Sequence, residues 1–236
     1  MMRTFLLIFL LFILTASSQT IAQYNEDNFS LSLNYNYTTT SKLFLNPNSP
    51  DPVLSSSYLE LNDIGSLSAE LRYRFTESLL LGLNYEYIKK SVSNINVRVN
   101  GIILEMKEGY IVTPVELTLY YILPFSTTHF KFIMGGGGGL YFGSEIRNLL
   151  EASVNNISRK IGYGIHVVTN IDYLFNDHIA LRWQMRFRDP EFQMKSQYNT
   201  QAVTYQNRKV LLPPSPFETK VNIDGITFSF GIAIIL

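Results

Sequence analysis

The 236-residue chain contains no cysteine. Disulfides, thiolate metal sites and an N-terminal lipidated cysteine are therefore excluded. Neither sign of charge dominates, because 19 basic and 19 acidic residues give a formal net charge of zero. Charge thus gives no reason to expect nucleic acid or an anionic membrane surface as a partner. Histidine is also scarce, with three in the whole chain.

Long hydrophobic runs are missing except at the N-terminus. Arg3 precedes an unbroken apolar run over residues 5–14, and small residues suited to cleavage follow at 16–18 and 20–22. Such a run is too short to span a bilayer comfortably as a helix, and this order of features is typical of a secretory signal peptide. We expect residues 1–22 to be a signal peptide that is removed, with an N-terminal membrane anchor as the alternative. Residues 23–236 are expected to form one domain.

The rest of the chain is dominated by alternation. In the last segment, Gly225 to Leu236, every even position from Ile226 onward is large and apolar, and the odd positions are small or polar except for Ile235. A period of two predicts a β-strand with two different faces. A terminal strand this long and apolar is an aggregation hazard unless both of its edges are paired. We therefore expect neighbours on both sides of it.

Seven other segments alternate in the same way: 29–37, 66–75, 79–87, 115–123, 130–142, 161–173 and 179–188. None of the eight apolar faces carries a charged residue. The opposite faces carry ten: Glu70, Arg72, Arg74, Glu86, Glu116, Lys131, Asp172, Arg182, Arg186 and Arg188. Alternation alone also fits a water-soluble β-sandwich, which turns its charged face to solvent.

Three features favour a membrane barrel. The strands are about as long as the nine to eleven residues needed to cross a bilayer, whereas soluble strands average about five or six. Aromatic residues gather at strand ends, as with Tyr35, Tyr37, Tyr85 and Tyr87 at one rim, which is typical of interfacial girdles. Short connections alternate with long ones. The sequence therefore predicts an all-β, eight-stranded, antiparallel up-and-down transmembrane β-barrel with short periplasmic turns and long extracellular loops.

Residues 113–125 and 130–142, with the terminal strand, resemble the outer-membrane protein β-barrel domain (porin-like) family of small eight-stranded barrels. The resemblance is architectural and implies no shared catalytic signature. It implies a location in the bacterial outer membrane, with lipid and lipopolysaccharide as surroundings. It also implies that the barrel-assembly machinery recognises the C-terminal strand Ile226–Leu236. We expect a monomer with no cofactor, no metal and no nucleic-acid partner.

The candidate site is a network of lumen charges, made up of the ten charged residues above and His166. An eight-stranded barrel is only wide enough to be filled by side chains, and buried charges must be paired or hydrated. Two interpretations stay open. The network is either a salt-bridged plug with trapped water or a narrow, slightly anion-preferring passage lined by arginines.

Three further segments carry local predictions. The run Gly135–Gly139 lacks the Gly-Lys-Ser/Thr of a phosphate-binding loop and predicts a tightly curved strand over which aromatic residues pack. Asn100-Gly101 predicts a type I′ hairpin that carries the third and fourth strands beyond the membrane. Segment 144–160 has apolar residues at helical spacing and predicts a short helical lid.

Catalytic residues do not stand out. His129 and His178 lie in short turns, and no long loop contains a histidine. The leading hypothesis is a non-enzymatic integral outer-membrane barrel with a structural, envelope-integrity or surface-binding role. A narrow porin-like channel for small solutes or hydrophobic compounds is the alternative. The third hypothesis is a lipid-modifying enzyme with a Ser-His-acid site around His166.

Overall fold

The computed structural model describes residues 28–99 and 101–236. The predicted signal peptide and Asn100 of the predicted hairpin lie outside the described residues. No helix in the described ranges is long and apolar enough to cross a bilayer.

The described chain is almost entirely antiparallel β-structure. Eight strands are long: β1 (Phe29–Phe44), β2 (Tyr58–Arg74), β3 (Leu79–Val99), β4 (Ile102–Ile122), β5 (Phe130–Leu149), β7 (Gly162–Leu174), β8 (Ile179–Arg188) and β13 (Ile226–Ile235). The remaining elements are short: helix α2 (Pro52–Ser56), β6 (Ala152–Arg159), β9 (Glu191–Tyr198), β10 (Ala202–Tyr205), β11 (Arg208–Leu211) and β12 (Phe217–Asn222).

The eight long strands form a closed ring. Each pairs antiparallel with two others in the order β1, β2, β3, β4, β5, β7, β8 and β13. Strand β13 then pairs with β1, from Ser30–Ile235 to Thr38–Thr227. The predicted eight-stranded antiparallel barrel is therefore confirmed, and the terminal strand has a partner on each edge.

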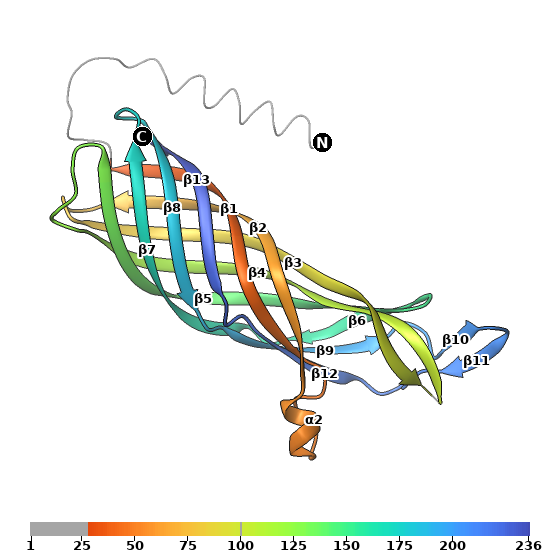
Figure 1. Ribbon diagram of the computed structural model, residues 1–236. Coiled ribbons are helices and arrows are strands. Elements are labelled where there is room, and N and C mark those ends of the chain that lie inside the picture. Colours follow the sequence, from red (N-terminus) through yellow and green to blue (C-terminus); the bar gives the residue numbers. More distant parts are fainter. Residues whose placement is uncertain (1–27, 100) are drawn as a thin grey trace.

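The two ends of the barrel differ. Short turns join β2 to β3, β4 to β5 and β7 to β8 at one end, where the backbones of Phe29 and Leu236 also bond to each other, at 3.2 and 2.8 Å. We call this the turn end; it lies at the upper left of Figure 1, near the C-terminus. At the opposite loop end, the strands run on into an extension that includes β6, β9 and β12.

In this loop-end extension, β12 pairs with β1, β9 with β12, and β6 with β9 and β5. Strands β3 and β4 pair as far as Val99–Ile102, where Gly101 has a φ of 82°. The predicted continuation of these two strands is therefore confirmed. Strands β2 and β3, in contrast, pair with each other only from Ser66–Ile88 to Arg74–Leu80 within the described residues. Beyond this point the edges of β2 and β3 that face each other have no strand partner.

The predicted helical lid over 144–160 is wrong. Residues up to Leu149 continue β5, and β6 returns antiparallel after a turn in which Leu150 has a φ of 51°. Leu149 and Ala152 are buried in an apolar cluster with Leu104 and Met106. Burial of alternate residues on one face of a strand outweighs the incidental helical spacing.

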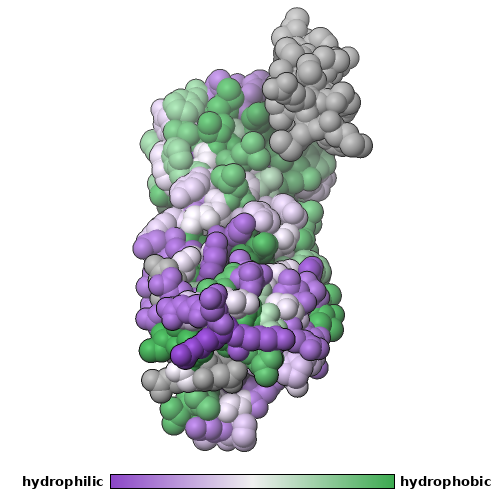
Figure 2. Space-filling view, turned by 90° about the vertical axis from the view of Figure 1, so that its right-hand side faces the viewer, coloured by the Kyte–Doolittle hydropathy of each residue, from purple (hydrophilic) through white to green (hydrophobic). Residues whose placement is uncertain are grey.

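The outer surface of the barrel is apolar. Side chains on the outward faces are well exposed, for example Leu33 at 66%, Leu67 at 68% and Ile165 at 81%. Figure 2 shows hydrophobic residues concentrated over the turn-end half of the visible face, and hydrophilic residues over the loop-end half. A continuous exposed apolar surface of this kind indicates contact with a membrane or another apolar partner.

Candidate functional site

The polar faces of the strands point into the barrel. Nine of the eleven predicted lumen residues are buried there: Glu70, Arg72, Glu86, Glu116, His166, Asp172, Arg182, Arg186 and Arg188. The other two, Arg74 and Lys131, are half-buried and line the mouth of the lumen at the turn end. The buried charged residues form two clusters along the barrel axis.

The turn-end cluster joins Arg72, Arg182, Glu70 and Asp172. Arg182 binds Asp172 in a bidentate manner, with Nε–Oδ1 and Nη2–Oδ2 both at 2.9 Å. Its Nη1 also donates to Glu70 Oε2 at 3.2 Å. Arg72 Nη2 donates to the same Glu70 oxygen at 2.9 Å and to Asn170 Oδ1 at 3.1 Å. One carboxylate oxygen thus accepts hydrogen bonds from two guanidinium groups.

The loop-end cluster joins Arg186, Arg188, Glu86 and Glu116. Arg188 Nη1 donates to Glu86 Oε2 at 2.7 Å and to Glu116 Oε1 at 3.3 Å. Arg186 Nη1 donates to Glu116 Oε2 at 2.6 Å, and Ser66 Oγ donates to Glu86 Oε1 at 2.5 Å. These are charge-assisted hydrogen bonds in a site without solvent exposure, where electrostatic interactions are strong.

The ion pairs cross the lumen. Arg182, Arg186 and Arg188 all lie on β8, while their acidic partners Glu70, Glu116 and Glu86 lie on β2, β4 and β3. In the ring of eight strands, β3 is directly opposite β8. The network therefore ties opposite walls together. Four buried arginines meet four buried carboxylates, so its formal charges balance.

Two buried tyrosines complete the network and were missed by the sequence analysis. Tyr120 donates through its hydroxyl to Glu70 Oε1 at 2.5 Å, and Tyr141 donates to Glu116 Oε1 at 2.5 Å. The signal that could have found them is their register, because Tyr120 lies opposite Gly135 and Tyr141 opposite Gly162. A glycine facing a large inward side chain leaves room for it inside a narrow barrel.

The glycine run lies within β5 and fits the predicted packing of aromatic residues. A Cβ added at Gly135 would lie 2.7 Å from the Tyr120 ring, and one at Gly137 would lie 1.9 Å from the carbonyl oxygen of Leu117. Neither contact is possible for a larger residue without movement of the backbone or of Tyr120. The glycines therefore allow β4 and β5 to approach closely and the tyrosine ring to lie against the wall.

His166 is buried and shares a 2.7 Å hydrogen bond between its Nε2 and Thr118 Oγ1. Its Nδ1 has no hydrogen-bond partner within the described residues. The two other histidines, His129 and His178, are exposed in turns at the turn end. No group of three residues able to hold a metal ion occurs in the described ranges.

Beyond the loop-end cluster, the interior becomes apolar. The buried cluster there contains Leu43, Leu61, Ile64, Ile88, Tyr110, Val112, Tyr141, Phe192, Met194, Val221 and Ile223. A second apolar cluster fills the far part of the extension. Ion pairs therefore dominate the interior of the described barrel strands, beside a small apolar cluster of Tyr120, Ile133 and Val168, and hydrophobic packing contributes most of the buried side chains of the extension.

Neither a protein-family model nor a curated protein sequence matches this chain. Among solved structures, the outer-membrane protein OprG from Pseudomonas aeruginosa matches with a TM-score of 0.58, at 12% identity, over 89% of this chain and 96% of that chain. This chain has the fold of an outer-membrane β-barrel.

Neisserial surface protein A matches with a TM-score of 0.48, at 12% identity, over 88% of this chain and 97% of its own. The outer membrane protein AlkL matches with a TM-score of 0.48, at 16% identity, over 92% and 94%. Identities this low relate chains by fold only, so the function of this barrel must be argued from its own side chains.

The loop-end extension contains a further group of buried charged residues, separate from the two clusters in the lumen. Arg147 forms ion pairs with both Glu108 and Glu145, and its guanidinium lies 4.2 Å from the centre of the Phe217 ring. Burial raises the pKa of Glu108 to about 8 and also raises the pKa of Glu145. Two carboxylates thus share one cation. Neither carboxylate was identified from the sequence, because Glu145 lies in the segment expected to be a helical lid and no inward face was assigned to the part of the fourth strand that contains Glu108.

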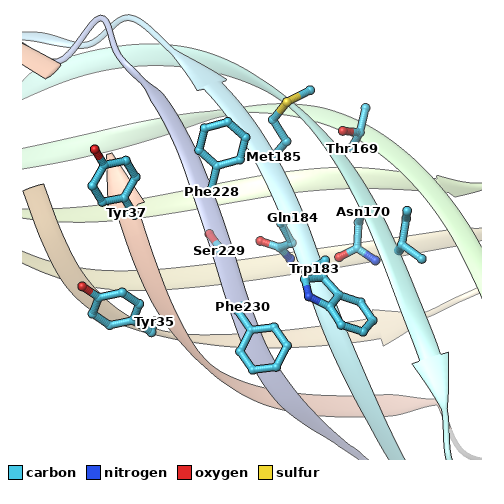
Figure 3. Close-up of a pocket in the computed structure, with 11 residues that line it drawn as sticks. Tyr35, Tyr37, Thr169, Asn170, Trp183, Gln184, Met185, Phe228, Ser229 and Phe230 are labelled. Carbon is cyan, nitrogen blue, oxygen red and sulfur yellow. The ribbon is translucent and has the colours of Figure 1, made fainter. Parts of the chain in front are cut away.

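The outer wall carries a shallow groove of about 410 Å³. Figure 3 shows two rows of side chains that cross β1, β13 and β8: Tyr35, Phe230 and Trp183 in one row, and Tyr37, Phe228 and Met185 in the other. Their spacing follows the strand register, and the rings of Trp183 and Phe230 are 5.5 Å apart. This surface offers apolar contact and few polar groups, as a lipid chain requires.

Proposed function

We propose that the protein is an integral barrel of the bacterial outer membrane, closed to diffusion, which anchors an extracellular β-extension with a structural or surface-binding role. The observation that carries the proposal is the set of ion pairs from β8 to β2, β3 and β4, which crosses the lumen. The buried apolar cluster in the extension also supports a closed interior.

The exposed apolar wall supports residence in a membrane. At the rim nearer the extension, Tyr35 and Tyr87 flank Leu67 on neighbouring strands, and all three are exposed. At the turn end, the rings of Phe29 and Tyr73 lie 4.9 Å apart. Two aromatic rims with an aliphatic zone between them fit the two interfaces and the hydrocarbon core of a bilayer.

The orientation follows from the lengths of the connections. Outer-membrane barrels have short periplasmic turns and long outer segments, so the turn end faces the periplasm and the extension faces outward. The proposal includes membership of the porin-like outer-membrane barrel family, contact with lipopolysaccharide, a monomeric state and recognition of Ile226–Leu236 by the assembly machinery. These features rest on the fold and on the apolar terminal strand.

A passage for solutes is less well supported. A conducting lumen lined by arginines needs guanidinium groups that are hydrated and available to ions. Here Arg182, Arg186 and Arg188 each bind a carboxylate and are at most 3% exposed. Removing one partner would leave a buried charge at a cost of about 3–5 kcal/mol, so the plug resists opening.

A surface-binding role is supported by the open edges of the extension. The distal parts of β2 and β3 leave backbone N–H and C=O groups without a strand partner between them. Such edges can accept an added strand from a partner. A non-enzymatic role is supported by the contact of His166 with Thr118 rather than with a serine and an acid.

Planar bilayer recording tests the proposal. Purified barrel, with insertion verified by its different gel migration before and after boiling, should give no conductance steps. A triple variant with Glu116→Ala, Arg186→Ala and Arg188→Ala removes three charged groups of the loop-end cluster and should raise ion leakage if it still folds. Stable steps from the unaltered protein would overturn the closed-barrel proposal and favour the channel.

A further inference from the structure

The strands of the loop-end extension form a second ring, which is closed except at one junction. In order around it, β1 pairs with β12, β12 with β9, β9 with β6, β6 with β5, β5 with β4 and β4 with β3. On the other side, β1 pairs with β2 as far as Phe44–Tyr58. Among the described strands of this ring, only β2 and β3 do not meet, because their pairing ends at Ser66–Ile88. We call the opening between residues 58–65 and 89–99 the seam.

The seam is flanked by two strands that are each held in place from the other side. Residues 58–65 of β2 are paired with β1, and residues 89–99 of β3 are paired with β4. In Figure 1, β2 lies beside α2 at this level, whereas β3 and β4 run on past it to their hairpin. Lys90 Nζ donates to the backbone carbonyl oxygen of Asp63 at 3.0 Å, so a lysine side chain spans the seam where direct strand pairing has ended. One inserted strand could pair with both edges and close the ring.

The apolar core of the extension reaches the seam from inside. Leu61, Ile64 and Ile88 are fully buried in this core. Leu59 on β2 and Val92 on β3 pack against the same cluster but are only partly buried. Because successive side chains of a strand point to opposite faces, apolar residues at alternate positions of an inserted strand would cover both.

The outward side of the seam is polar. On β2 it carries the exposed residues Glu60 and Asn62, and Glu60 lies opposite a base, Lys42 on β1. On β3 it carries the exposed Lys89, which lies opposite the uncharged Ile111 on β4. Opposite charges on neighbouring strands stabilise their pairing. An acidic residue beside Lys89 would therefore favour an inserted strand more than a basic residue would.

We propose that the seam binds an extended peptide segment of a partner protein, which inserts as one strand between β2 and β3 and closes the ring of the extension. The segment alternates apolar side chains, which face Leu59 and Val92, with polar side chains, which face water and include an acidic residue beside Lys89. This inference rests on the proposed surface-binding role and specifies the partner of that role. The seam lies beyond the aromatic rim of Tyr35 and Tyr87, so it does not depend on whether the lumen conducts.

Amide hydrogen exchange of the purified full chain in detergent tests the proposal. The probe is a short synthetic peptide that alternates valine with threonine and carries one outward-facing glutamate at its centre. In excess, it should slow exchange along 58–65 and 89–99, because backbone amides of both edges gain acceptors. Residues 66–74 of β2 already pair on both sides and should not change. A peptide of the same composition with its valines grouped together lacks the alternation and should give no protection.

Fluorescence anisotropy of the labelled peptide measures the contribution of the charge. Lys89→Glu should weaken binding about threefold, since like charges on adjacent strands destabilise their pairing. A peptide with lysine in place of its central glutamate should restore binding to this variant. Lys107→Glu is the matched control, because it makes the same change at an exposed position on β4, with β3 between it and the seam. This control should bind the original peptide like the unaltered protein.

Protection of both edges by the alternating peptide, and not by the grouped one, supports the proposal. It is overturned if the alternating peptide leaves both edges unprotected, if the grouped peptide protects them equally, or if Lys89→Glu binds as tightly as Lys107→Glu. Edges that are already protected without peptide, in protein that sediments as a dimer, would assign the seam to a second copy and also overturn it. A conducting barrel whose seam still binds the peptide would refute the closed lumen alone.

Discussion

The hydroxyl of Tyr120 on β4 donates a 2.5 Å hydrogen bond to the buried carboxylate of Glu70 on β2. The face of the same ring lies 4.0 Å from the guanidinium of Arg72. One tyrosine therefore binds an acid through its hydroxyl and contacts a base through the face of its ring. It does so two strands away from both, in a position that the glycines beside it leave open.

Replacing Tyr120 with phenylalanine should lower the free energy of unfolding by about 1–3 kcal/mol, since the ring is kept and Glu70 loses a donor. Urea unfolding of the barrel in lipid vesicles measures this. Tyr121→Phe is the matched control, because the neighbouring Tyr121 faces outward and is 43% exposed. Equal stabilities of the two variants would contradict a role for the Tyr120 hydroxyl in the network.

Gly137→Ala should destabilise the barrel by at least about 1–3 kcal/mol, because its Cβ would overlap the carbonyl oxygen of Leu117 on β4. Gly138→Ala makes the same chemical change on the opposite face, where the nearest atom is 3.5 Å away. We expect that control to fold like the unaltered chain. The measurement is the folded fraction after dilution into vesicles, and similar folding of both variants would refute the close approach of β4 and β5.

The extension should become less stable as pH rises. Burial raises the pKa of Glu108 from 4.5 to about 8, so between these values the folded state holds a proton that the unfolded chain has released. The stability of the extension is therefore greatest below pH 4.5 and is lost as the pH rises from 4.5 to about 8. Glu108→Gln has a neutral side chain at every pH, so the extension should stay stable above pH 8. Amide hydrogen exchange in β4 should then be slower in this variant than in the unaltered protein.

The control for this titration is Glu105→Gln, an exposed position on the same strand. It should leave the pH profile of hydrogen exchange unchanged. Some pH dependence should persist in Glu108→Gln, since burial also raises the pKa of Glu145. A profile that does not differ between Glu108→Gln and the unaltered protein would show that Glu108 does not control it.

Trp183, the single tryptophan of the chain, lies on the outer groove and is a direct reporter of its surroundings. In vesicles, brominated lipid chains should quench most of its fluorescence, and aqueous iodide should quench little. Moving the tryptophan with Trp183→Phe and Ile157→Trp places it on the exposed side of β6 in the extension. The two quenchers should then exchange their effects. Iodide quenching at Trp183 would exclude contact with lipid at this groove.

Sequence alternation was sufficient to locate all eight barrel strands, because large apolar residues on the outward faces alternate with mostly small, polar or charged residues on the inward faces. It could not assign the ion pairs. Whether Arg188 meets Glu86 depends on the stagger between strands, and alternation specifies a face but no register. The hairpin of β3 and β4 in the extension was predicted, but the ion pairs of Arg147 with Glu108 and Glu145 were not, since the apolar spacing in 144–160 suggested a helix.

Strands β1 and β13 are also joined inside the barrel, where the hydroxyls of Thr38 and Thr227 lie 2.7 Å apart although 189 positions separate them in sequence. Contacts between such distant residues require the entropy of a very long loop to be overcome before they form. The hairpins from β2 to β5 can form from local segments, whereas this contact needs both extremes of the fold. We therefore expect the closure of this junction to be the slow, cooperative step of folding, and a chain that stops before it would leave two sheet edges unpaired.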